Sequence, residues 1–137
     1  LAIDDANIEN GCLRFIKGSH KEKKLKIHNI SDNKNLTLNQ ELDESEYNEK
    51  DAVNLILKRG QISLHDVYLV HGSEANNSSM ARRAITMRFM PTSSVFDHQM
   101  VKDKNLFSKL NASKYQDRKI YHMRGRDISE KNNLTYI

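Results

Sequence analysis

A histidine, a serine and an arginine follow one another closely in "HGSEANNSSMARRAITMRF", residues 71–89. Ser73 lies two positions after His71, and Arg82 lies eleven positions after it. A neutral imidazole is a common metal ligand. A guanidinium binds a carboxylate through two parallel hydrogen bonds that a lysine cannot reproduce. The segment could therefore combine a metal ligand with a receptor for a carboxylate.

The same residues also have an ordinary structural interpretation. A histidine on the apolar-leaning face of a strand is more often hydrogen-bonded than ligating, and Arg82 could pair with Asp66 or Glu74 at a rim. Arg82 shares its predicted strand face with the small Ala84, however, and an inward-facing arginine needs an anionic partner because an unpaired internal charge is costly. Arg83 points to the opposite face by alternation, so we expect it at the surface unless a bulge exchanges the two arginines.

The elements that must position these residues are predicted to be strands. Four segments carry β signals: 12–16, 25–30 (weakly), 52–72 and 83–90. The third consists of two β-rich runs on either side of a turn at Arg59-Gly60, and the last alternates as a strand should. Residues 105–116 could form a short helix. Strand after strand with long polar loops predicts an all-β sandwich or barrel with minor helix.

The composition fits one domain that lies outside the membrane. A chain of 137 residues has room for one core and not for two, and it contains neither a membrane-spanning apolar run nor a signal peptide. The net charge of +4 comes from scattered basic residues, so we expect no nucleic-acid partner and no membrane partner. The lone Cys12 indicates a buried thiol in a reducing cytoplasm. We expect a single domain over 1–137, with a long surface loop at 31–50 and a C-terminal extension at 92–137.

Three segments resemble the phytanoyl-CoA dioxygenase family. "LAIDDANIENGCLRFIKGSH" is similar to the family's passage from Asn-Gly-Cys-Leu to Pro-Gly-Ser-His, with Lys17 in place of the proline. "LKRGQISLHDVYLVHGSEANNSSMARRAITMRFMPT" is similar to the family's second half, in which His-Gly-Ser, Asn-x-Ser and Arg follow in this order. "HMRGRD", 122–127, matches a tail motif of bacterial members. Because these motifs cover most of the chain in the family's order, the chain is identified as a member.

The resemblance implies a double-stranded β-helix, the cupin-like jelly roll of the Fe(II)- and 2-oxoglutarate-dependent dioxygenases. Such an enzyme uses O2 to hydroxylate a small or acyl-type organic substrate and releases succinate and CO2. By motif match, His71 would be an iron ligand, Arg82 would bind the far carboxylate of 2-oxoglutarate, and Ser73 would assist with its hydroxyl group. The resemblance assigns no further catalytic residue in this chain, and the oligomeric state stays open.

The family's first ligand pair, His-x-Asp, lies upstream of Asn-Gly-Cys-Leu, and this chain starts after it. We therefore expect an incomplete jelly roll that belongs to a longer protein and is inactive alone. His20-x-Glu22 formally satisfies His-x-carboxylate, but the family pattern places His20 in the Gly-Ser-His motif and Glu22 in a lysine-rich loop.

Several alternatives stay open on sequence alone. A halogenase, in which Ala or Gly replaces the carboxylate ligand, differs only at a position outside this chain. A non-catalytic jelly-roll binding domain would have no need to keep His71, Ser73 and Arg82 together. His65 could line the pocket or simply close its strand.

Overall fold

The structure, a computed structural model, describes residues 1–32, 40–98 and 117–137. The strands are β1 (Leu13–Ile16), β2 (His28–Ile30), β3 (Gln40–Leu42), β4 (Ala52–Leu55), β5 (His71–Ser73), β6 (Ile120–His122) and β7 (Leu134–Tyr136). The 3-10 turns are η1 (Ser19–Glu22), η2 (Glu44–Glu46) and η3 (Glu49–Asp51). The predicted all-β class is therefore confirmed, while the jelly-roll connectivity stays a prediction.

The chain divides into two compact units. Unit 1 comprises Leu1–Asn29 and Glu41–Met87, and unit 2 comprises Ile30–Gln40 and Arg88–Ile137. All three residues that the sequence proposes for chemistry belong to unit 1, and the described part of the expected C-terminal extension lies entirely in unit 2. Across the described ranges, no helix has the length and apolar character needed to cross a membrane.

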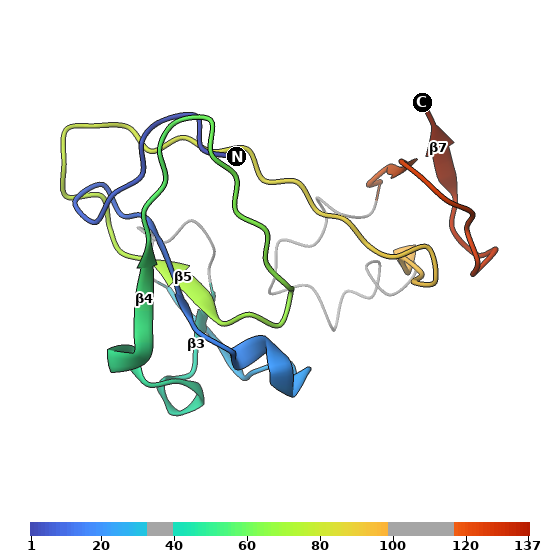
Figure 1. Ribbon diagram of the computed structural model, residues 1–137. Helices are drawn as coiled ribbons and strands as arrows, with labels where there is room; N and C mark the ends of the chain where they lie inside the picture. The colour runs from blue at the N-terminus through green and yellow to red at the C-terminus, as the bar shows by residue number, and fades with distance from the viewer. Residues whose placement is uncertain (33–39, 99–116) are drawn as a thin grey trace. The chain divides into compact units, whose positions relative to one another are not determined.

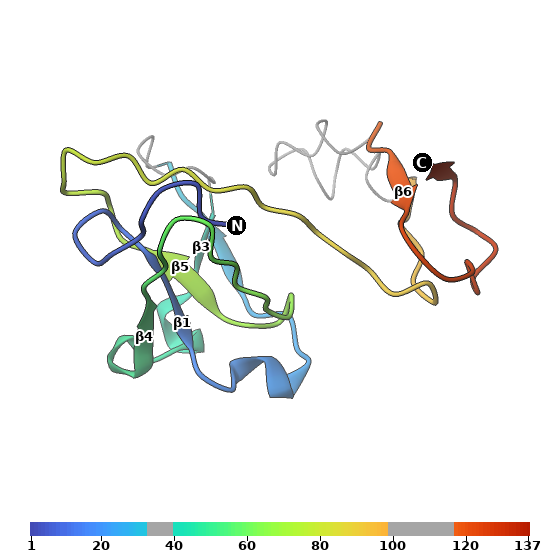
Figure 2. The same ribbon diagram turned by 45° about the horizontal axis from the view of Figure 1, so that its top comes forward.

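Unit 1 is built on an antiparallel three-stranded sheet in the order β4-β1-β5 (Figures 1 and 2). Leu13 in β1 pairs with Leu55 and Ser73, and Phe15 pairs with Val53 and His71. Residues opposite each other on antiparallel strands point to the same face of the sheet. One face therefore carries the following side chains: Leu13, Phe15, Val53, Leu55, His71 and Ser73. The register places the predicted iron ligand beside an aromatic residue of β1.

A tight turn before β1 holds that strand against the chain that follows β5. Asn10 is completely buried, and its side-chain Oδ1 accepts a hydrogen bond from the Asn7 amide at 2.8 Å. Gly11 has a φ of +73°, and a Cβ atom there would lie 2.5 Å from the carbonyl oxygen of Glu74. Only glycine combines this backbone conformation with such a close approach. Gly11 of the Asn-Gly-Cys-Leu motif thus allows the turn before β1 to pack closely against the end of β5, the strand that carries His71.

Replacing Gly11 with alanine is expected to destabilise unit 1 by about 2–4 kcal/mol, since the left-handed φ and the backbone clash both oppose a Cβ atom. Urea unfolding of the complete protein measures this loss. Gly60→Ala is the matched control, because Gly60 has a φ of +85° but no atom within 4 Å of its Cβ position. It should lose only about 1–2 kcal/mol. Equal losses for both variants would contradict the packing role of Gly11.

The β-rich segments around the predicted turn pair only in part. The turn at Arg59-Gly60 is confirmed, with the Gln61 amide donating to the Lys58 carbonyl at 2.9 Å. The run after it contributes the three residues of β5, and the strand predicted at 83–90 is wrong beyond an isolated bridge from Ala2 to Ala84. A strand requires a hydrogen-bonding partner along its length. In the described chain, residues 83–85 find one only in residues 1–4.

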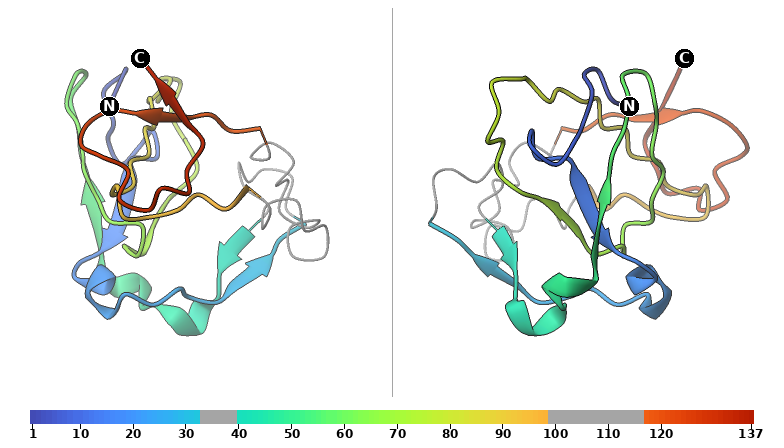
Figure 3. Two further views of the ribbon diagram at one scale, coloured as in Figure 1. Left: turned by 90° about the vertical axis from the view of Figure 1, so that its right-hand side faces the viewer. Right: turned by 60° about the vertical axis from the view of Figure 1, so that its left-hand side comes forward.

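Two smaller sheets complete the described elements. β2 pairs with β3 in a two-stranded sheet (Figure 3), and β6 pairs with β7 in a parallel one. The range expected as a surface loop, 31–50, thus contains β3, η2 and the start of η3, while 33–39 fall outside the described residues. The helix expected at 105–116 also falls outside them.

Burial is sparse in the part of the chain that the structure describes. Its buried apolar side chains are Ala2, Ala6 and Cys12. Cys12 is a free thiol whose exposed fraction is 3%. The predicted burial of Cys12 is confirmed. Leu64, by contrast, is 90% exposed in the segment that follows the Arg59-Gly60 turn. The described elements of unit 1 therefore leave large apolar side chains uncovered.

Candidate functional site

An apolar hollow of about 440 Å³ lies against the sheet of unit 1. Its lining combines the sheet, the turn after β1 and the segment between β4 and β5: Leu13, Phe15, Lys17, Gly18, His20, Leu55, Ile62, Ser63, Leu64, His65, Asp66 and Leu69. His71 and Ser73 share a sheet face with Leu13 and Phe15, which line the hollow. The two predicted site residues of β5 therefore lie on the sheet face that borders an apolar space.

The ring of His71 is held by its own backbone. Its Nδ1 lies 2.6 Å from the carbonyl oxygen of Leu69. A carbonyl oxygen only accepts hydrogen bonds, so Nδ1 carries the hydrogen, and in the neutral ring Nε2 then keeps its lone pair. Metal-binding histidines commonly donate one ring N–H to a backbone carbonyl in this way, which fixes the tautomer and the ring orientation. In the neutral ring, the Nε2 atom of His71 is therefore the nitrogen that could bind a metal ion.

His65 lies between the hollow and His71. It lines the hollow, and its ring centroid is 4.8 Å from that of His71 with the planes tilted by 57°. Partial burial lowers the pKa of His65, and the neighbouring His71 lowers it further. Of the two interpretations left open by the sequence, the structure favours a His65 that lines the pocket.

The two adjacent arginines differ in their partners. Arg83 is exposed and binds Asp4 through two side-chain hydrogen bonds of 2.8 Å, which hold the pKa of Asp4 well below its usual range. Arg82 is half-buried and makes no hydrogen bond or ion pair with the described part of the chain. The predicted surface position of Arg83 is therefore confirmed.

The proposed rim partners of Arg82 are engaged elsewhere. Asp66 pairs with Lys23 at 2.5 Å, and Glu74 pairs with Arg14 at 2.5 Å. The interpretation of Arg82 as a rim arginine paired with either carboxylate is therefore wrong. Within the described ranges no hydrogen bond connects Arg82 with His71 or Ser73.

The rival ligand pair, His20 and Glu22, does not assemble with His71. Glu22 binds Lys26 at 2.7 Å, and this hydrogen bond lowers the pKa of the Glu22 carboxyl group. His20 lines the hollow from η1. The described residues contain no group of three His, Cys, Asp or Glu side chains that could hold a metal ion. The structure therefore gives the rival pair no support.

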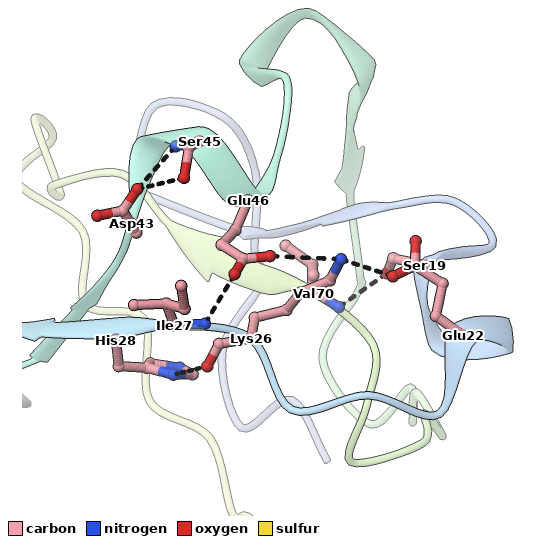
Figure 4. A network of polar contacts seen from close by, with 9 residues as sticks. All are labelled: Ser19, Glu22, Lys26, Ile27, His28, Asp43, Ser45, Glu46 and Val70. Atoms are coloured by element: carbon pink, nitrogen blue, oxygen red, sulfur yellow. Dashed lines mark hydrogen bonds and ion pairs between the residues drawn. The ribbon is translucent and has the colours of Figure 1, made fainter.

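Ser19 is a supporting residue to which the sequence assigned no role. Its hydroxyl oxygen accepts a hydrogen bond from the Val70 amide at 2.9 Å, directly before His71 (Figure 4). The signal was present in the Gly-Ser-His motif, but nothing in the spacing shows that residue 19 reaches residue 70. Asn10 was also missed, although its hydrogen bonds are local, to Asn7 and to the Asp5 carbonyl.

Comparisons with known proteins find one family and several relatives similar to this chain. The family model for phytanoyl-CoA dioxygenase (PhyH) matches residues 1–84. A phytanoyl-CoA dioxygenase domain-containing protein 1 homolog of Dictyostelium discoideum is 37% identical over 91 residues, covering 65% of this chain and 32% of the relative. The homolog of the same name in Caenorhabditis elegans is 33% identical over 99 residues, covering 66% and 33%.

A plant relative matches at a similar level. The phytanoyl-CoA dioxygenase of Arabidopsis thaliana is 33% identical over 87 residues, covering 64% of this chain and 30% of the relative. The chain thus spans about a third of the length of the curated relatives that it matches. No solved structure matches.

Proposed function

The chain belongs to the phytanoyl-CoA dioxygenase family, and on that premise we propose that it forms part of an Fe(II)- and 2-oxoglutarate-dependent dioxygenase. The proposed substrate is a small or acyl-type organic molecule that occupies the apolar hollow beside β1 and β5. The observation that carries the proposal is the His71 ring, whose Nδ1 hydrogen bond to Leu69 leaves Nε2 free on the sheet face that borders the hollow.

Three side chains of this chain fit the groups that such an enzyme binds. His71 would contribute one of the three protein ligands of the two-histidine, one-carboxylate iron site. Arg82, whose guanidinium has no partner among the described residues, would bind the distal carboxylate of 2-oxoglutarate. The Ser73 hydroxyl group, exposed on the same strand as His71, would add a hydrogen bond to that carboxylate. The remaining two ligands would come from the rest of the complete protein.

Each side chain has a distinct task in the proposed reaction. When bound, iron and 2-oxoglutarate supply the oxidative decarboxylation that yields succinate and CO2 and drives hydroxylation of the substrate. The protein orients the reactants: Arg82 and Ser73 hold one end of the cosubstrate, and the tautomer of His71 is fixed by Leu69. The apolar lining from Leu13 and Phe15 excludes water from the substrate.

Succinate formation by the complete protein tests the proposal. We expect slow conversion of 2-oxoglutarate to succinate even without a substrate, because Fe(II), O2 and 2-oxoglutarate suffice for decarboxylation. This conversion should occur only when Fe(II) is present. Treatment with a chelator should stop the reaction, and Fe(II) should restore it. Absence of both succinate formation and Fe(II)-dependent binding of 2-oxoglutarate would contradict the proposal.

A further inference from the structure

We propose that Ser19 is a positioning residue for His71, an inference that rests on the proposed function. Ser19 belongs to the Gly-Ser-His motif, which the proposed iron and 2-oxoglutarate chemistry leaves without a role. In the structure, the Ser19 side chain fixes the backbone of Val70, the residue directly before His71. The hydroxyl group would thereby hold the imidazole in the position needed for metal binding.

The contacts of Ser19 close a small hydrogen-bonded network at the end of β1. Its hydroxyl group accepts from the Val70 amide and donates to the Ile16 carbonyl, both at 2.9 Å. The Ile16 amide in turn donates to the Val70 carbonyl at 2.9 Å. Both backbone polar groups of Val70 are therefore bound, one by a strand residue and one by a side chain.

The hydroxyl group is needed because β1 ends at Ile16. Gly18, with a φ of +84°, turns the chain into η1, and the Ile16 carbonyl, the last acceptor of β1, accepts from the Ser19 hydroxyl group and not from the Val70 amide. The part-buried Val70 amide would then lack a partner, which costs on the order of 1–3 kcal/mol for a buried donor. The Ser19 hydroxyl group bridges the Val70 amide and the Ile16 carbonyl, two groups that face each other across the end of the β1–β5 ladder.

The hydrogen bond from Val70 to Ser19 lies next to the contacts that hold the His71 ring in place. The ring bonds the Leu69 carbonyl at 2.6 Å, and the backbone of His71 pairs with Phe15. Val70 lies between these two anchor points. If the Val70 amide were released, the segment from Leu69 to His71 could shift and the Nδ1 hydrogen bond would change with it. Loss of such outer hydrogen bonds typically weakens metal affinity by about 10- to 100-fold.

Figure 4 contains a matched control for this role. Ser45 in η2 donates through its hydroxyl group to Asp43 at 2.5 Å, so Ser45→Ala removes the same atom from the same unit without touching β5. Ser19→Thr keeps a hydroxyl group at residue 19 and should retain the function. Ser19→Cys, similar in size but with only a weak acceptor, provides a second test if Ser19→Ala does not fold.

The experiment is a titration of the iron-free complete protein with Co(II) alone, followed by visible absorption. We expect Ser19→Ala to bind Co(II) at least about tenfold more weakly, with faster hydrogen exchange at the Val70 amide. Ser45→Ala and Ser19→Thr should stay within about twofold of the unmodified protein. At saturating Fe(II), the KM for 2-oxoglutarate should change much less than Co(II) affinity, because Arg82 lies on another segment and Ser73 pairs with Leu13, away from Val70.

Two outcomes would overturn the proposal in different ways. In the first outcome, His71→Ala weakens Co(II) binding, whereas Ser19→Ala shows faster exchange at the Val70 amide but binds Co(II) as tightly as Ser45→Ala. Ser19 is then not a positioning residue, and the proposed function stands. If His71→Ala leaves Co(II) binding unchanged, the proposed function fails and the role of Ser19 fails with it.

Discussion

His71→Ala is expected to abolish Fe(II)-dependent succinate formation by the complete protein. The imidazole would be one of three protein ligands, and its Nδ1 hydrogen bond to Leu69 prepares Nε2 for the metal. Since loss of an outer-shell partner alone costs about 10- to 100-fold in affinity or activity, loss of the ligand itself should exceed about 100-fold. Succinate production at several Fe(II) concentrations measures the effect.

His65→Ala is the matched control for the His71 variant. The two rings lie 4.8 Å apart, so each substitution removes an imidazole from almost the same place. Because His65 has no assigned role as a ligand, its loss should change Fe(II) affinity by less than about tenfold. If the His65 variant lost the metal and the His71 variant retained it, the ligand would have been assigned to the wrong histidine.

Local sequence patterns predicted a strand correctly where partner strands are present to pair with it. The apolar run at 12–16 became β1 because turns bound it and two strands are available to pair with it. Alternation at 83–90 predicted a strand equally well, yet only Ala84 forms a bridge. Alternation reports which face a side chain would occupy, but it does not report whether a neighbouring strand is present.

The contacts that hold the candidate site together join residues far apart in the chain. Ser19 reaches Val70 over 51 residues, and Asp4 reaches Arg83 over 79. No periodicity encodes such pairs, so the residue types suggested candidate roles for His71 and Arg82 but not the contacts around them. Gly11 is an instructive case, because its motif was visible in the sequence while the close approach of Glu74 was not.

Arg82→Ala is expected to raise the KM for 2-oxoglutarate on the order of 100-fold while leaving Fe(II) affinity nearly unchanged. Truncating one partner of a buried, hydrogen-bonded charge pair costs about 2–5 kcal/mol, and each 1.4 kcal/mol corresponds to about tenfold. Arg82→Lys should recover only part of the loss, because an ammonium group keeps the charge but not the paired hydrogen bonds. Initial rates of succinate formation against 2-oxoglutarate concentration measure both variants.

Arg83→Ala separates the two adjacent guanidinium groups. Arg83 is already bound to Asp4 and its side chain is 72% exposed, so its removal should leave the KM within about twofold of the unmodified value. A KM raised by Arg83→Ala and not by Arg82→Ala would mean that the two residues exchange roles in the complete protein. Arg83 would then have to leave Asp4 before 2-oxoglutarate could bind. The Asp4→Asn variant would in that case bind 2-oxoglutarate more tightly, whereas an Arg82 receptor predicts no change.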